Sequence, residues 1–131
     1  MSYNLLLDTS FRNVNKHWKL TNCEYKDGFI VGNSTTYSIE QEIVLPNPTK
    51  LYFSLEYLCF DPNIKYVYCG IYHENGCLEA TRRKPKIRKR KRISVVDQLI
   101  TEKVKVMFIV EAKTPDTRIY VDRPLLVDLT Y

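Results

Sequence analysis

The chain has 131 residues, of which 44% are hydrophobic and 27% are charged, so its composition excludes an intrinsically disordered protein and its length suits one domain. No apolar run reaches the roughly 18 residues that a membrane-spanning helix needs. The formal net charge is +5, from 20 basic and 15 acidic residues.

The first segment, MSYNLLLDTSF at 1–11, lacks a basic start and has only three consecutive apolar residues. It is therefore unlike a signal peptide, and we expect synthesis in a cytoplasm.

Alternating apolar residues dominate the chain after residue 35, and helical periodicity is nearly absent. This period of two predicts strands over 35–45, 50–60, 103–110, 118–122 and 125–131, separated by turn signals such as Asp27-Gly28. The short segment 94–100 is the only helix candidate, and we expect its first half to be a strand. The inward-facing positions predict a core that includes Leu6, Trp18, Ile39, Ile43, Phe53, Leu55, Val67, Ile71, Val106, Phe108, Ile119 and Leu126.

Asn75-Gly76 predicts a two-residue type I′ hairpin turn, because both turn positions need positive φ. The implied register pairs Tyr72 with Glu79 and Ile71 with Ala80. One face then carries the core residues Val67, Cys69, Ile71, His73, Leu78 and Ala80. The outer face carries Tyr66, Tyr68, Tyr72, Glu74, Glu79, Thr81 and Arg83. Pro85 is expected to end the pairing, because proline has no N–H to donate.

The segment RRKPKIRKRKR at 82–92 contains nine basic residues and no acid, which leaves 11 basic and 15 acidic residues elsewhere, a net charge of −4. Nucleic-acid-binding domains usually collect basic residues from several elements, so one basic run in an acidic body is less typical of them. We expect a loop or strand edge at 82–92 with Ile87 and Ile93 as inward anchors and the arginines projecting outward, where they discourage edge-to-edge aggregation. Counter-charges would come from the acidic body of a neighbouring copy or from another protein.

Four segments in order carry a family resemblance: NLLLDTSF at 4–11 followed by Trp18, YSIEQEIVLPNPTKLYFSLEY at 37–57, RKRISVV at 90–96, and IYVDRPLLVDL at 119–129. Together they resemble carbohydrate-binding-module-like (galactose-binding-like) jelly rolls over nearly the whole chain. The resemblance implies an all-β protein, a two-sheet antiparallel jelly-roll sandwich formed by a single domain, 1–131. The closing segment also resembles small bacteriophage virion proteins built on this fold.

Many members of that family hold a structural calcium ion with an acidic residue just after the early Phe and an Asp of the closing strand. Here Arg12 follows Phe11, which leaves Asp8 and Asp122 as weak calcium candidates. The alternative is that Asp8 caps a turn and that Asp122 pairs with Arg12 or Arg123. The spacing of Cys23, Cys59, Cys69 and Cys77 is not typical of a zinc site, so we expect reduced structural thiols and no cofactor.

The chain contains no GxSxG, HExxH or glycine-rich phosphate loop, and its two histidines, His17 and His73, fit ordinary structural positions. Glu40 and Glu42 share one strand face about 6.6 Å apart, near the separation of paired glycosidase carboxylates. We interpret them as part of a solvated strand face. The sequence therefore predicts a protein that is not an enzyme.

The resemblance and the basic run favour a structural protein of a bacteriophage virion: a capsid decoration, head-fibre or tail accessory module made in the host cytoplasm. We expect it to dock in multiple copies on other virion proteins through Arg82, Arg83, Lys84, Arg88, Arg90 and Arg92, and to contact host-surface glycans through Tyr66, Tyr68 and Tyr72. Two alternatives stay open: a stand-alone glycan-binding module, and a nucleic-acid-binding protein that uses 82–92. No membrane partner is expected.

Overall fold

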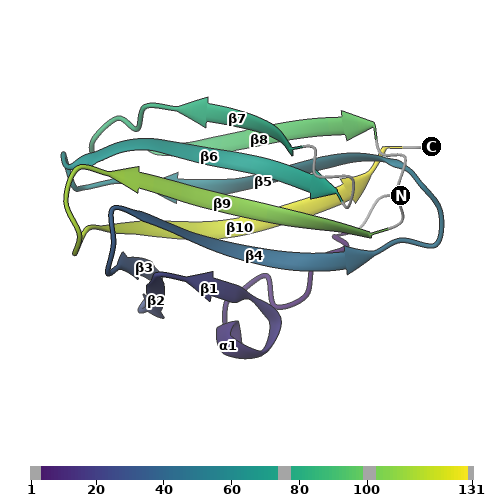
Figure 1. Ribbon diagram of the computed structural model, residues 1–131, viewed down its shortest axis with the longest axis horizontal. Helices are drawn as coiled ribbons and strands as arrows, with labels where there is room; N and C mark the ends of the chain where they lie inside the picture. Colours follow the sequence, from purple (N-terminus) through teal and green to yellow (C-terminus); the bar gives the residue numbers. More distant parts are fainter. Residues whose placement is uncertain (1–3, 74–77, 99–102, 130–131) are drawn as a thin grey trace.

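The computed structural model describes residues 4–73, 78–98 and 103–129, and it confirms a two-sheet antiparallel jelly-roll sandwich (Figure 1). The sheet that we call the first has the strand order β1-β4-β9-β6-β7, and the second has the order β2-β3-β10-β5-β8. In the described residues one short helix, α1 (Val14–His17), precedes the strands β1 (Lys19–Thr21), β2 (Cys23–Lys26), β3 (Phe29–Gly32), β4 (Thr36–Val44), β5 (Lys50–Leu58), β6 (Ile64–His73), β7 (Leu78–Arg83), β8 (Arg90–Gln98), β9 (Lys103–Ala112) and β10 (Arg118–Asp128). Within the described ranges no helix has the length and apolar character needed to cross a membrane.

The core lies between the two sheets and follows the alternation of the strands. In β9, for example, Val104, Val106, Phe108 and Val110 are buried, and the residues between them are not. Of the predicted core residues whose side chains are described, all are buried except Ala80, which is exposed, and Ile43, which is half-buried and packs against the core. Because burial of one large apolar side chain contributes about 1.5–3 kcal/mol, this shared interior explains why the sequence folds as one sandwich.

Pro124 was expected to separate two closing strands, and this prediction is wrong: β10 is one strand with a register shift between Asp122 and Leu125. The bulge absorbs Arg123, whose φ is +50°, and the proline without breaking the pairing with β5. Asn4 supports this site, because its amide donates to the Pro124 carbonyl oxygen and its side-chain oxygen accepts the Leu126 N–H.

The predicted hairpin register is shifted by one residue. Tyr72 pairs with Leu78 instead of Glu79, and Ile71 pairs with Glu79 instead of Ala80. Because a slip of one residue turns every side chain to the other face, Thr81 and Arg83 lie on the inner side of β7, and exposed Ala80 lies on the outer side. A tertiary contact fits this register, since the Thr81 hydroxyl donates to the Ser94 carbonyl oxygen of β8 at 2.6 Å. The turn residues Asn75 and Gly76 lie outside the described residues.

The basic run 82–92 spans two sheet edges, as predicted for a strand edge. Its first residues end β7 at Arg83, residues 84–89 connect the sheets, and Arg90 begins β8. Both strands are edge strands of their sheets (Figure 1). Ile93 is buried as expected, but Ile87 is 41% exposed, so its predicted role as an inward anchor is wrong. Ile87 instead forms an isolated parallel bridge with Cys59, which keeps it at the surface.

Three of the four cysteines, Cys23, Cys59 and Cys69, are free and buried. Burial raises the pKa of Cys23 to about 11 and raises the pKa of the Cys59 and Cys69 thiols as well. Thiols of this kind are poor nucleophiles, which fits a structural role. Cys77 lies outside the described residues.

Candidate functional site

The outer surface of the first sheet carries Tyr66, Tyr68 and Tyr72, and we call it the tyrosine face. All three project from β6 on the side opposite the buried residues Val67 and Ile71. This part of the hairpin prediction is confirmed. Which side chains of β6 point outward depends only on the alternation within β6, so the shifted pairing with β7 does not affect it.

The strand registers arrange the tyrosine face in rows that cross the sheet. Three rows contain Ser38-Ile109-Tyr68-Arg82, Glu40-Met107-Gly70-Ala80 and Glu42-Lys105-Tyr72, in that order. Gly70, which lies between Tyr68 and Tyr72 on this side of β6, has no side chain.

Polar contacts hold two of the three tyrosines in place. The Tyr68 hydroxyl donates to Glu111 Oε1 at 2.7 Å, and Lys65 Nζ lies 3.4 Å from the other oxygen of Glu111. The Arg82 guanidinium lies over the Tyr66 ring, 4.6 Å from its centroid. The hydrogen bond raises the pKa of Tyr68 and lowers the pKa of Glu111. Rings fixed in this way lose little freedom when a ligand binds.

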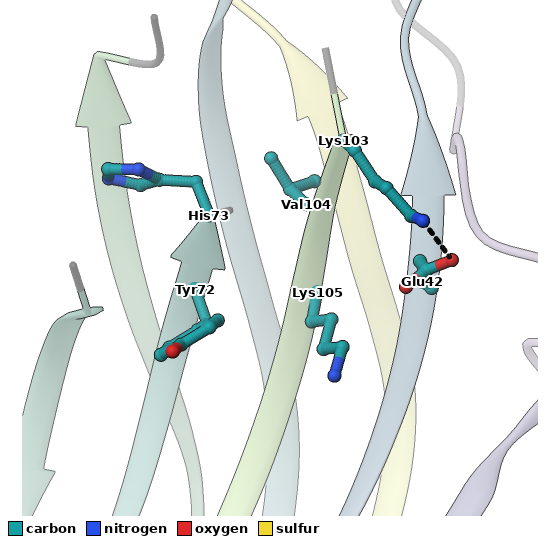
Figure 2. Close-up of a pocket in the computed structure, with 6 residues that line it drawn as sticks. All are labelled: Glu42, Tyr72, His73, Lys103, Val104 and Lys105. Carbon is teal, nitrogen blue, oxygen red and sulfur yellow. Dashed lines mark ion pairs between the residues drawn. The ribbon is translucent and has the colours of Figure 1, made fainter. Parts of the chain in front are cut away.

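A groove runs from the tyrosine face across the sheet. Its first part is a pocket of about 220 Å³ lined by Glu42, Tyr72, His73, Lys103, Val104 and Lys105 (Figure 2). A second hollow of about 470 Å³ shares Glu42 and Lys105 and continues over Asn15, Lys16, His17, Trp18, Lys19, Glu40 and Gln41. We call the two together the sheet groove. It was not anticipated from the sequence, because it depends on which residues β4, β9 and α1 bring together.

Glu40 and Glu42 lie in this groove on β4, each beside a lysine of β9. Lys103 Nζ lies 3.5 Å from Glu42 Oε1 (Figure 2), and Lys105 Nζ lies 3.7 Å from Glu40 Oε2. Both carboxylates therefore take part in ion pairs along the floor of an open groove. Alternating carboxylates and ammonium groups suit hydrogen bonding to a hydroxyl-rich ligand.

The predicted docking residues are not brought together as one patch. Arg82 belongs to the tyrosine face, whereas Arg83 and Lys84 line a hollow of about 230 Å³ with Tyr57, Lys86, Lys91 and Arg92. Arg88 is exposed in the connection, and its N–H donates to the Cys59 carbonyl oxygen.

Arg90 and Arg92 find their counter-charges within the same chain. Glu56 on β5 lies 3.0 Å from Arg92, 3.7 Å from Arg90 and 3.8 Å from Arg123. Asp122 on β10 adds contacts to Arg90 at 3.7 Å and to Arg123 at 3.8 Å. The pairing of Asp122 with Arg123 confirms one of the sequence interpretations.

Asp8, the other calcium candidate, acts as a cap. Its carboxylate accepts the N–H groups of Arg12 and Asn13 at 2.7 and 3.0 Å, just before α1. Within the described residues no group of three or more His, Cys, Asp or Glu side chains is placed to hold a metal ion.

A buried pair at the end of the sandwich was also not anticipated. His73 Nε2 lies 3.4 Å from Asp97 Oδ2, and the two side chains are 8% and 12% exposed. The two residues are 24 positions apart, on β6 and β8, so no local pattern connects them.

Comparison with known proteins identifies the fold. No protein-family model matches the sequence, and no curated protein sequence is similar to it. Among solved structures, the xylan-binding module CBM15 superposes with a TM-score of 0.70 at 10% identity, covering 98% of this chain and 96% of that chain. TmCBM61, solved with β-1,4-galactotriose, gives 0.69 at 11% identity, covering 95% and 97%.

Two further similar structures have different roles. Tailspike protein 4 of bacteriophage CBA120 gives a TM-score of 0.63 at 10% identity, covering 96% of this chain and 21% of that chain. The Stig cyclase Fisc from Fischerella sp. TAU gives 0.69 at 10% identity, covering 99% of each chain. The chain thus has the jelly-roll fold of carbohydrate-binding modules, a fold that also occurs in a phage tailspike and in an enzyme.

Proposed function

We propose that this chain is a non-catalytic glycan-binding domain whose ligand lies across the tyrosine face and along the sheet groove. One observation carries the proposal: Tyr66, Tyr68 and Tyr72 project from one strand onto the open face of a sheet, beside a groove with a charged floor.

The chemistry of the face suits a sugar chain. Aromatic rings offer flat apolar surfaces for the C–H faces of pyranose rings. The Tyr68 ring is already fixed by its hydrogen bond to Glu111, and the Tyr66 ring is held by Arg82, which covers one of its faces. The ion-paired carboxylates and lysines of the groove can accept and donate hydrogen bonds to sugar hydroxyls. The fold adds support, since CBM15 is described as xylan-binding and TmCBM61 was solved with a galactotriose.

Replacement of Tyr68 and Tyr72 by alanine tests the proposal. We expect the double variant to lose binding on a glycan array and in affinity electrophoresis with soluble xylan and galactan, while its melting temperature stays nearly unchanged. Tyr52→Ala is the matched control, because Tyr52 is half-buried on β5 of the other sheet. A double variant that folds and keeps the full glycan binding of the parent would contradict the proposal.

We further propose that this domain is part of a bacteriophage virion, where it docks in several copies on other virion proteins and presents the tyrosine face to host-surface glycans. The similarity in fold to the CBA120 tailspike supports this role, with the match covering 21% of that chain. Mass spectrometry of purified particles tests it, with copy number from labelled peptides. Particles that lack the protein would overturn the virion role and leave the stand-alone glycan-binding module.

A further inference from the structure

We infer that the hollow between β7 and β8 binds an anionic group, and that the ligand of this domain is therefore an acidic polysaccharide. The inference rests on the proposed glycan-binding function and specifies its ligand class. We call this site the basic hollow: Tyr57, Arg83, Lys84, Lys86, Lys91 and Arg92.

The charge of the basic hollow is the first argument. Five of its six lining residues are cationic and none is acidic. Arg92 is engaged by Glu56. For Arg83, Lys84, Lys86 and Lys91, no carboxylate of the described residues lies within ion-pair distance. Clustered like charges repel one another, so an anion in the hollow would relieve a repulsion that the folded chain leaves in place.

The fold builds this cluster from two sheet edges. Arg83 lies opposite Val67 in the first sheet, and Lys91 lies opposite Tyr57 in the second. Residues directly opposite each other across a strand pair share a face, and both Val67 and Tyr57 are buried between the sheets. Arg83 and Lys91 therefore both lie on the inner sides of adjoining edges, which the Thr81–Ser94 hydrogen bond links. A solvated basic tail would have no such arrangement.

The buried tyrosine strengthens the site. Tyr57 is only 2% exposed, and burial raises the pKa of its phenol, an effect that nearby Arg83 partly offsets. An aromatic floor lowers the local dielectric constant, which increases the attraction between the surrounding cations and a bound anion. The volume of about 230 Å³ suits one charged substituent rather than a complete small-molecule ligand.

Position connects the basic hollow to the tyrosine face. Arg82 covers the Tyr66 ring and lies opposite Tyr68, and the next residue, Arg83, lines the hollow. A sugar chain that crosses the sheet along the Tyr68 row and passes around the β7 edge reaches these cations, which lie on the inner side of that edge. A carboxylate, sulfate or phosphate substituent on that chain would be bound there. The continuity favours an acidic polysaccharide over a nucleic acid or an acidic protein.

Two double variants of the full chain test the inference. Lys86→Ser with Lys91→Ser removes two cations from the basic hollow. Arg88→Asn with Lys89→Ser removes the same charge from the same exposed segment without altering the hollow, and asparagine tolerates the positive φ of residue 88. Isothermal titration calorimetry with polygalacturonate, dextran sulfate, unsubstituted dextran and a short single-stranded DNA gives the affinities, and circular dichroism confirms the fold of each variant.

We expect the hollow variant to bind polygalacturonate or dextran sulfate at least about tenfold more weakly than the parent, and the control variant to stay within about twofold. Carboxylate and sulfate sources are distinguished by which of the two polymers binds. An equal loss in both variants, or no binding of either polyanion by the parent, would overturn the inference. Tighter binding of DNA than of both polysaccharides, lost in the hollow variant, would also overturn it and favour nucleic acid.

The tyrosine variants separate this inference from the proposed function. If Tyr68→Ala with Tyr72→Ala abolishes binding of the neutral glycans found on the array while Lys86→Ser with Lys91→Ser has no effect on any ligand, the glycan-binding function stands and the anionic subsite is overturned. If the hollow variant alone loses polyanion binding, the subsite stands and the tyrosine face is not the glycan site.

Discussion

Lys91 and Arg92 are neighbours in the same basic run and both line the basic hollow, yet of the two only Arg92 has an acidic partner among the described residues. Arg92 lies on the outer side of β8, where it donates to Ser54 and Glu56 of β5. Lys91 lies on the inner side, opposite Tyr57, and lines the basic hollow. The charge of Arg92 is largely neutralised within the chain, whereas the charge of Lys91 is available to a ligand.

This difference shows that a count of charges along the sequence does not measure the charge that a partner meets. Strand alternation sends successive basic residues to two sides, and only one side has acidic neighbours. Those neighbours, Glu56 and Asp122, come from β5 and β10, more than thirty positions away from Arg90 along the chain. Substitutions of inward-facing and outward-facing residues on these strands test this division.

We expect the largest loss of stability at Phe53, which lies on the inner side of β5 and is 1% exposed. We expect Phe53→Ala to lower the free energy of unfolding by about 3–5 kcal/mol, because it leaves a cavity between the sheets. Urea denaturation measures this. The adjacent outward residue provides the control, and Tyr52→Ala should cost less than about 1 kcal/mol. A larger cost at Tyr52 than at Phe53 would contradict the assigned faces.

Removal of Glu56 should have the next largest effect. This side chain is 15% exposed and contacts three guanidinium groups. Among the described residues, Glu56→Ala therefore leaves Arg92 without a carboxylate partner and leaves Arg90 and Arg123 with Asp122 alone. We expect a loss of about 2–3 kcal/mol in the free energy of unfolding, smaller at high salt because salt screens the repulsion. Glu24→Ala, at an exposed position of β2, is the control and should change stability by less than about 0.5 kcal/mol. Equal effects at the two positions would show that the arginines do not depend on Glu56.

Alanine at Lys91 and at Arg92 compares the two neighbours directly. Arg92→Ala removes one charge-assisted hydrogen bond to Glu56 and one to Ser54, and it should cost about 1–2 kcal/mol. Lys91→Ala should cost less than about 0.5 kcal/mol, because it removes one member of a cluster of like charges. Thermal unfolding of both variants at low salt gives the comparison. A Lys91 variant as unstable as the Arg92 variant would mean that Lys91 has an internal partner.

The smallest effect concerns Glu111, a half-buried carboxylate on β9 of the first sheet. The Tyr68 hydroxyl holds the pKa of Glu111 below its usual value, so the stabilisation is present above the unfolded-state pKa and is lost as the pH falls through the lowered pKa. Tyr68→Phe should raise the pKa of Glu111 toward its usual value. Titration of the Glu111 carboxyl carbon by NMR measures the shift. Tyr66→Phe should leave that pKa in place, and a matching shift in both variants would argue against the hydrogen bond as its cause.

Local alternation in the sequence was enough to predict β4, β5, β6 and β9, most of the core residues and the outward position of Tyr66, Tyr68 and Tyr72. These features depend only on the two-residue repeat within each strand. Burial between the sheets strongly favours the arrangement in which the apolar side chains face inward. The end of β7 before Pro85 was also predicted correctly, because it depends on a single residue that cannot donate a hydrogen bond.

Two features depend on the tertiary structure alone: the register of the β6–β7 hairpin, and which residues of the basic run have acidic partners. The Asn-Gly signal favours one local turn, but the side of β7 that faces β8 is set by contacts such as Thr81 with Ser94. Likewise, Arg90 and Arg92 are neutralised only because β8 pairs with β5 and β5 pairs with β10. Such contacts join residues far apart in the chain, so their energies cannot be predicted from a local sequence pattern. The same strand pairing leaves Lys86 and Lys91 in the basic hollow without a counter-charge among the described residues.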